Sequence, residues 1–259
     1  MTRDALARLS PSELRALIRR GGHDGPTSGL AGGYLQANLV VLPARHAAAF
    51  EAFCRANPAA LPVVCRGRDG DPLLDCGADV DVRTDLGLYR VHRNGHHVET
   101  RTDIADLWHG GLTAFALGCW FANEAALLRA GVRLRHIEQG VDGGLYRTAV
   151  ANHPSGPFVG TLVVSMRPFH RDAIDRVRAV TGTNPLAHGQ PVHHGDPAAL
   201  GIGDLGTPDF GTVLLPAPDE EPVFWACGLT GQEALLDAGV DMFITHEPGR
   251  MLATDLPAP

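Results

Sequence analysis

Long hydrophobic runs are missing from this chain of 259 residues, which bears on where the protein acts. An uncharged stretch near residues 112–123 is too short to cross a bilayer. Residues 1–22 have neither the apolar segment nor the cleavage site of a secretory signal, and Asp4 and Glu13 argue against a transit peptide. We therefore expect a cytoplasmic protein without a membrane partner.

Basic and aromatic side chains are also scarce. Aromatic residues make up 6% of the chain, the formal net charge is −7, and no block of Lys or Arg forms a stripe. A nucleic-acid-binding surface is basic, and one that binds single strands also carries aromatic platforms. We therefore expect no nucleic-acid partner.

Several familiar site motifs are absent as well. The five cysteines are an odd number without paired spacing, which argues against a disulfide framework, and the absence of C-x-x-C argues against a structural zinc site. The glycine-rich stretch 22–34 is not followed by the lysine of a phosphate-binding loop, and no G-x-S-x-G marks a hydrolase serine. We expect no metal and no cofactor, although the histidine-rich stretch 188–197 leaves a metal-dependent hydrolase of lactams or amides open.

One cysteine setting occurs twice. "CWFANEAALLRAGV" begins at Cys119 and "CGLTGQEALLDAGV" begins at Cys227, with the ALL and AGV triplets at the same spacing. Each block predicts a cysteine where the chain enters a short helix that a glycine then ends. Free N–H groups and the helix dipole at such a position lower the pKa of a thiol. Both cysteines are thus candidate catalytic groups, although small buried core residues would show the same pattern.

The remaining patterns predict a mixed α/β protein. A capping box at Ser10 and Glu13 begins a helix, residues 43–54 have helical spacing, and Asn94 with Gly95 marks a hairpin. We also expect a helix from Asp103 to Gly118. Two apolar strands are expected near the end of the chain, at 221–228 in the centre of the main sheet and at 242–249.

The pattern changes at Val132. Residues 132–140, 145–150 and 161–169 have the alternation of strands, and a helical stretch follows them. This order predicts a smaller α+β domain, 132–200, inserted into a layered α/β main domain of residues 1–131 and 201–259. The duplicated cysteine blocks add an internal repeat to this expected architecture.

Polar groups at expected strand ends or helix starts are the candidate acids and bases. Glu124 follows Cys119 closely enough for both to lie within about one helical turn. His136 and Glu138 would point to one face of a strand and suit proton sharing. His246 leaves an apolar strand, and its ordinary pKa lies near neutrality. Glu124 also has a structural interpretation as a helix-dipole carboxylate, and His136 with Glu138 has one as a cross-strand polar pair.

Candidate substrate contacts are cations and donors that suit an acidic molecule. Arg147 and Arg167 stand near strand ends, and a guanidinium binds a carboxylate in a planar, bidentate way. The other candidates are His136 and three residues of the histidine-rich stretch, namely His188, His193 and Asp196. We expect the loops 136–138, 188–196 and 245–249 to line one cleft where the two domains meet.

Taken together, the motifs resemble the D-glutamate cyclase family of hydro-lyases. The resemblance is carried, in chain order between Pro26 and Asp255, by "GYLQANLVVLP", "GCWFANEAALL", "VVSMRP", "HGQPVHHGDPAALGI", "PVFWACG" and "ITHEPGRMLATD". It implies a compact cytosolic α/β protein of amino acid metabolism. The implied activity is the loss of water from D-glutamate, which closes the ring of 5-oxo-D-proline.

On this basis we expect a lyase with a small acidic molecule as its partner. In the implied reaction Arg147 or Arg167 holds the α-carboxylate, and a base takes a proton from the amine. The candidate bases are Glu124, Glu138 and His246, and the candidate proton carriers or thioester formers are Cys119 and Cys227. A homodimer stays open, and so does a non-catalytic protein that binds an acidic metabolite.

Overall fold

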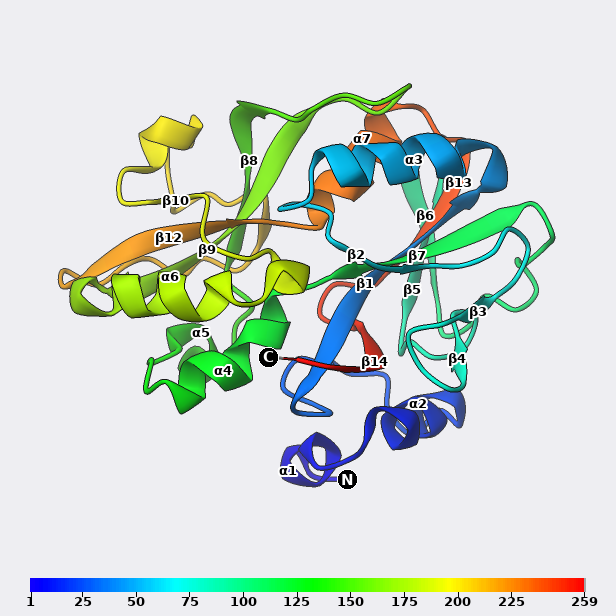
Figure 1. The fold of residues 1–259 in the computed structure, drawn as a ribbon, viewed down its shortest axis with the longest axis horizontal. Helices are drawn as coiled ribbons and strands as arrows, with labels where there is room; N and C mark the ends of the chain where they lie inside the picture. The colour runs from blue at the N-terminus through cyan, green and yellow to red at the C-terminus, as the bar shows by residue number, and fades with distance from the viewer. Residues whose placement is uncertain (259) are drawn as a thin grey trace.

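The computed structural model describes residues 1–258 and contains two antiparallel sheets side by side (Figure 1). The first sheet has the order β2-β7-β1-β13-β5-β6, and β14 pairs with β1 outside this path. Its strands are β1 (Tyr34–Pro43), β2 (Val63–Arg66), β5 (Tyr89–Arg93), β6 (His96–Arg101), β7 (Leu112–Gly118), β13 (Met242–His246) and β14 (Leu252–Pro257).

The second sheet has the order β10-β12-β9-β8-β11. Its strands are β8 (Gly144–Ala151), β9 (Thr161–His170), β10 (His193–His194), β11 (Phe210–Gly211) and β12 (Glu220–Ala226). A separate two-stranded ladder joins β3 (Leu73–Leu74) and β4 (Val80–Asp81).

Short helices connect and cover the strands. The α-helices are α1 (Arg3–Ala7), α2 (Pro11–Arg19), α3 (Ala44–Ala56), α4 (Glu124–Arg129), α5 (Arg135–Gln139), α6 (Ile174–Gly182) and α7 (Leu229–Asp237). Single 3₁₀ turns are η1 (Trp120–Asn123), η2 (Arg171–Ala173), η3 (Pro185–Ala187) and η4 (Pro197–Leu200). No helix among residues 1–258 is long and apolar enough to cross a membrane.

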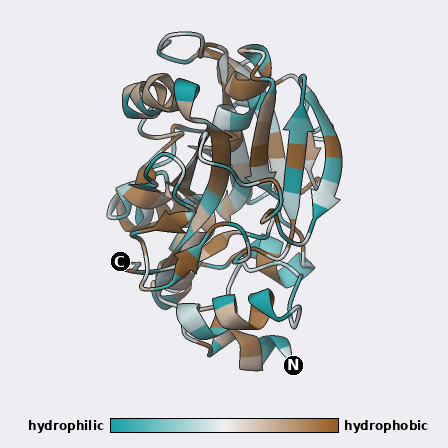
Figure 2. Ribbon diagram, turned by 90° about the vertical axis from the view of Figure 1, so that its right-hand side faces the viewer, coloured by the Kyte–Doolittle hydropathy of each residue, from teal (hydrophilic) through white to brown (hydrophobic). Residues whose placement is uncertain are grey.

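The centre of the first sheet is buried on both faces, and the alternation along β1 shows this directly. Leu39 and Val41 belong to the core on one face, whereas Val40 and Leu42 pack on the other with α3 and α7. Every residue of β7 is buried. In Figure 2 hydrophobic residues accordingly gather on strands inside the molecule. A third core, which includes Trp120 and Trp225, packs α4 and α6 against the second sheet.

The two sheets repeat one order of elements. In the first, β1 is followed by α3 and β2, and β7, which lies between β2 and β1, is followed directly by Cys119. In the second, β9 is followed by α6 and β10, and β12, which lies between β10 and β9, is followed directly by Cys227. The internal repeat expected from the cysteine blocks is therefore larger than those blocks, because it includes three strands and a helix of each sheet.

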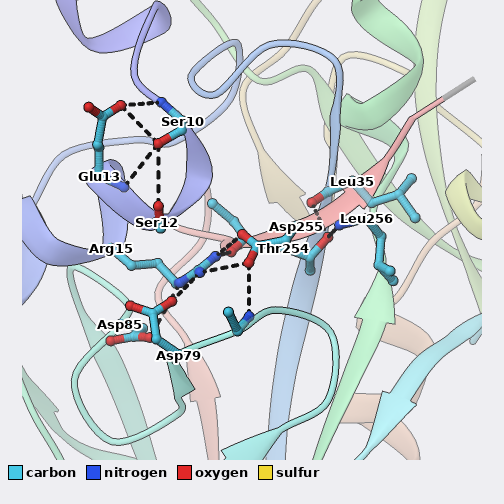
Figure 3. Close-up of polar contacts among 12 residues, drawn as sticks. Ser10, Ser12, Glu13, Arg15, Leu35, Asp79, Asp85, Thr254, Asp255 and Leu256 are labelled. Atoms are coloured by element: carbon cyan, nitrogen blue, oxygen red, sulfur yellow. Dashed lines mark hydrogen bonds and ion pairs between the residues drawn. The ribbon is translucent and has the colours of Figure 1, made fainter.

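A buried arginine fixes the N-terminal helices to the rest of the molecule (Figure 3). Arg15 in α2 is fully buried, and its Nη1 donates to Ala253 O and Asp255 Oδ1 of β14, both at 2.8 Å. The same guanidinium pairs with Asp79, and its Nε lies 3.7 Å from the buried Asp85. The network thus connects three segments that are far apart in the sequence.

The mixed α/β class is confirmed, as are the capped helix at Pro11, the helix after Pro43 and the hairpin of β5 and β6. Asn94 (φ 50°) and Gly95 (φ 79°) have the left-handed backbone that its tight turn requires. Residues 135–139, expected as a strand, form α5. The helix expected up to Gly118 is wrong, because residues 112–118 are the buried strand β7.

The strand near 221–228 was expected in the main sheet and instead is β12 of the second sheet, paired with β9 from Glu220 to Ala226. The second sheet therefore uses residues on both sides of position 200. The division into a main domain and an insertion at 132–200 stays a prediction.

Candidate active site

One cavity of about 410 Å³ is lined by residues of both sheets. The first sheet contributes side chains from β1, β5 and β13, and the second contributes them from β8, β9 and β11. Of the residues proposed from the sequence, those in its wall are Cys119, Arg147, Arg167, His188, Cys227 and His246. The cavity thus brings together residues from opposite halves of the chain.

The two cysteines have the same local structure, as the duplicated sequence predicts. Each thiol accepts a hydrogen bond from the backbone N–H two residues later, that of Phe121 or Leu229. The helices that follow end alike, because Gly131 (φ 72°) and Gly239 (φ 64°) are left-handed. The next N–H bonds back to Leu127 O in one case and to Leu235 O in the other.

The expected lowering of the thiol pKa is wrong. Burial raises the pKa of Cys119 to about 12 and also raises that of Cys227, against the opposing effects of the N–H bonds and of Arg167. Removing a thiolate from water therefore outweighs the dipole and the nearby cation here. The two thiols lie close enough for their charges to interact, since Cys227 contributes to the raised pKa of Cys119.

Arg167 is the buried cation of the cavity. Its side chain extends from β9, its Nη2 donates to Asp142 O at 3.0 Å, and its Nε and Nη1 have no hydrogen-bond partner. The guanidinium lies over the ring of Trp120 (4.1 Å to the centroid) and near that of Phe121 (5.3 Å). No carboxylate of residues 1–258 forms an ion pair with it. A cation with two unused N–H donors in a cavity wall suits an anionic ligand.

Arg147 also lines the cavity but already has two carboxylate partners. It pairs with Asp209 at 3.0 Å and with Glu233 at 2.6 Å, and its guanidinium lies 4.6 Å from the centroid of Phe210. Its side chain is 49% exposed. Of the two arginines proposed from the sequence, Arg167 is therefore the one with free binding capacity.

Two histidines in the wall are uncharged at neutral pH. Burial lowers the pKa of both His188 and His246 to about 4. His188 Nδ1 lies 2.8 Å from Ala59 O, and because a carbonyl only accepts, Nδ1 carries the proton and Nε2 the lone pair. His246 bonds to the Leu39 backbone, and its Nδ1 is buried without a partner. Both rings can therefore accept a proton from a ligand.

Glu124 and His136 form a buried pair behind the wall, outside the cavity lining. His136 Nε2 donates to Glu124 Oε1 at 2.8 Å, and burial lowers the pKa of His136. The edge of the His136 ring meets Trp120, with 5.5 Å between centroids. Trp120 in turn contacts the Arg167 guanidinium. Glu124 and His136 therefore support Arg167 through Trp120 and do not contact a ligand in the cavity.

Three other residues proposed from the sequence lie away from the cavity. Glu138 is exposed on α5 and pairs with Arg133 at 2.7 Å. His193 bonds to Asp196 O, and the Asp196 side chain caps η4 through the N–H of Ala198. Of the three loops expected to share one cleft, only those at His188 and at 245–249 contribute to the lining.

Several polar groups in the cavity wall were not predicted from the sequence. Among the described residues, nine buried side-chain nitrogen or oxygen atoms lack a hydrogen-bond partner, and seven of these belong to residues of the lining. Besides His246 Nδ1 and the two atoms of Arg167, they are Arg90 Nε, His92 Nδ1, Trp120 Nε1 and Ser165 Oγ. Buried polar atoms normally have partners, so this concentration marks a place where a ligand supplies them.

Arg90 and His92 occupy alternate positions in β5, which was the only local signal that they share a face. No group of three or more His, Cys, Asp or Glu side chains in residues 1–258 is arranged to hold a metal ion. In the histidine-rich stretch, His194 instead faces Glu221, with 3.3 Å between Nδ1 and the carboxylate.

Comparison with known proteins places the chain among close relatives. A family model described as D-glutamate cyclase matches residues 113–255. A protein of Rubrobacter xylanophilus is 50% identical over 94% of this chain and 95% of its own length. One of Jannaschia sp. is 48% identical over 94% and 92%, and one of Pseudomonas aeruginosa is 48% identical over 96% and 95%. All three are named "putative hydro-lyase".

Among solved structures, a nitrogen repressor-like protein from Methanococcus jannaschii aligns with a TM-score of 0.41 and 13% identity, covering 90% of this chain and 91% of its own. The relatives at 48–50% identity are aligned over nearly the whole chain, so their match includes both cysteine blocks and every wall of the cavity. The chain therefore belongs to the D-glutamate cyclase family.

Proposed function

We propose that the protein is a hydro-lyase that acts on a small amino or carboxylic acid and closes D-glutamate to 5-oxo-D-proline with loss of water. The observation that carries the proposal is Arg167, a buried guanidinium in the cavity wall with two unused N–H donors. A carboxylate would satisfy both donors and the charge at once. The choice of D-glutamate as the acid follows from the description of the family as D-glutamate cyclase.

The reaction joins the amine nitrogen to the side-chain carboxyl carbon and breaks one C–O bond of that carboxyl. The ammonium group loses two protons, which leave with the departing oxygen as water. With the α-carboxylate on Arg167, we assign these proton transfers to the uncharged rings of His188 and His246 in the cavity wall. Glu124 supports Arg167 through His136 and Trp120 rather than acting on the substrate.

The test is turnover of D-glutamate, with formation of 5-oxo-D-proline followed by chiral chromatography. We expect Arg167→Gln to raise KM about 10–100-fold, because a charge-assisted hydrogen bond contributes about 1.5–3 kcal/mol. Arg147→Gln is the matched control, since it removes a guanidinium of the same cavity that already has carboxylate partners.

Equal loss in the two variants would contradict the assignment of the carboxylate to Arg167. Wild-type protein that binds D-glutamate, seen as a rise in Tm, but never converts it would overturn the hydro-lyase and favour a metabolite-binding protein.

A further inference from the structure

We propose that Cys119 and Cys227 form an acid–base pair that removes and replaces the hydrogen on the carbon next to the substrate's carboxylate. The protein would then exchange this hydrogen with solvent and invert the configuration of that carbon, in addition to any loss of water. The inference rests on the proposed function in one respect, namely that Arg167 holds the carboxylate.

The geometry that carries this inference is the meeting of two equivalent thiols in one cavity. Cys119 follows β7 of the first sheet and Cys227 follows β12 of the second, so the two cysteines of the lining come from different sheets. Each is held by the N–H two residues later, and each interacts electrostatically with Arg167. In this proposal a carboxylate bound to Arg167 brings its neighbouring carbon within reach of both sulfurs.

The other acid–base groups of the wall do not make such a pair. His188 is held by Ala59 O in a loop after η3, and His246 by the Leu39 backbone at the end of β13, so the two rings do not belong to a repeated element. The thiols alone share strand, turn, hydrogen bond and following helix. Inversion of a carbon needs this arrangement, because one face must lose a proton while the other gains one.

The step needs no reactant besides water. One of the two thiols first loses its proton to water. The resulting thiolate takes the proton of the Cα–H bond and becomes a thiol again, and the electron pair of that bond moves into the carboxylate. Arg167 stabilises the added negative charge on the carboxylate oxygens. The thiol of the other cysteine then gives its proton to the opposite face of the carbon and becomes a thiolate. The product is the mirror-image acid, with the two sulfur protonation states exchanged.

Burial suits this chemistry. A hydrogen next to a carboxylate is a very weak acid, and a base accepts its proton more readily when the pKa of its own conjugate acid is high. The dry setting that raises the pKa of both thiols therefore also makes either thiolate a stronger base. The exclusion of water also prevents solvent from protonating the carbanion before the second cysteine does.

The experiment incubates wild-type protein in D₂O with D-glutamate, L-glutamate and the two enantiomers of 5-oxoproline. Proton NMR follows the loss of each Cα–H signal, and chiral chromatography follows inversion. We expect both enantiomers of at least one compound to exchange and interconvert. Cys119→Ser and Cys227→Ser should each lose inversion at least 100-fold.

The decisive result is an opposite preference of the two variants for the enantiomer whose Cα hydrogen they exchange. Each retains one thiol, so each should still exchange the enantiomer whose hydrogen faces that thiol, and the two variants should favour opposite enantiomers. A cysteine needed only for packing would slow both enantiomers equally, and that result would overturn the proposal. Cys65→Ser is the control, because this cysteine lies in β2 outside the cavity lining.

Failure of this inference is distinguishable from failure of the proposed function. Formation of 5-oxo-D-proline without deuterium at Cα supports the cyclisation and overturns the cysteine pair. Exchange without cyclisation does the reverse. If the wild-type protein exchanges none of the four compounds, the inference is wrong whatever the cyclisation assay shows.

Discussion

Three histidines in the cavity wall, His92, His188 and His246, lie where burial lowers the pKa of each to about 4. His92 stacks on Phe243 with 4.4 Å between ring centroids, which leaves little water around it. Burial likewise keeps the two cysteines as thiols, and it also lowers the pKa of Arg167, although a guanidinium starts from so high a pKa that it stays charged. At neutral pH the wall between the sheets therefore presents a buried cation among uncharged proton donors and acceptors.

These histidines make stability depend on pH. In the unfolded chain each binds a proton near pH 6.5, whereas in the folded protein none does so until about pH 4. Their stabilising contribution is therefore full above pH 6.5 and is lost as the pH falls towards 4. We expect each to lower the free energy of unfolding by up to about 1.4 kcal/mol per pH unit in this window.

Urea unfolding at pH 7.5, 6.0 and 5.0 measures the effect. His188→Asn keeps a donor for Ala59 O but does not titrate, so its stability should fall less steeply with acid than that of the wild type. His96→Asn, at an exposed position, should follow the wild-type slope. If the free energy of unfolding changes equally with pH in all three proteins, His188 does not contribute to the pH dependence as predicted.

At the scale of elements, a close backbone approach positions the cavity wall. A Cβ at Gly118, the last residue of β7, would lie 1.5 Å from Leu186 O in η3. Similarly, a Cβ at Gly228 would lie 2.7 Å from Asn38 Nδ2. Each cysteine of the pair thus has a glycine beside it where another segment passes without room for a side chain.

Gly118→Ala should therefore displace η3, together with His188 that follows it. We expect a loss of about 2 kcal/mol or more in the free energy of unfolding, because the contact is with backbone and cannot be relieved by a side-chain rotation. Binding of 5-oxo-D-proline, measured by calorimetry, should weaken as well. Gly203→Ala is the control, since a Cβ there meets nothing within 4 Å. Equal stability of the two variants would contradict the predicted clash.

Local sequence signals recovered only part of the architecture. The capping box at Ser10 and the turn at Asn94 act within a few residues, so the elements that they mark were predictable. Strand β7 was misread as a helix because a strand buried on both faces loses its alternation. Residues 135–139 alternate like a strand, yet they form a helix.

The candidate site was predictable to a similar extent. The cysteines, Arg167 and His246 stood out through their local motifs. Arg90 and His92 did not, because they reach the cavity through the pairing of β5 with β13, about 150 residues later in the chain. Glu138 was proposed because it would share one face of a strand with His136, two residues earlier, but these residues form a helix.

At the scale of the whole molecule, the Arg15 network joins the first helices, the segment 79–85 and the last strand. Arg15 is fully buried and Asp85 has a fully buried side chain, so these charges depend on one another for solvation. Loss of one partner leaves a buried charge without compensation, which costs far more than an exposed pair contributes.

We expect Arg15→Met to lower the free energy of unfolding by about 3–5 kcal/mol. In a protein of this size that corresponds to a fall in Tm of roughly 10 °C. Arg45→Met is the matched control, because Arg45 pairs with Asp241 while both side chains are about 60% exposed. It should change stability by less than about 1 kcal/mol. Calorimetric scans of both variants decide the question, and similar Tm values would contradict the structural role of Arg15.

The repeated order of strands and helices has a consequence for how the site is assembled. A single repeat contains one cysteine and one wall of the cavity. It would obtain a second thiol only by pairing with another copy of itself, and the two walls would then be identical. Within one polypeptide the walls are free to differ. The first sheet provides Arg90, His92 and His246, and the second provides Ser165 and Arg167. In the proposed reaction this difference between the walls would orient a chiral acid relative to two thiols that are themselves alike.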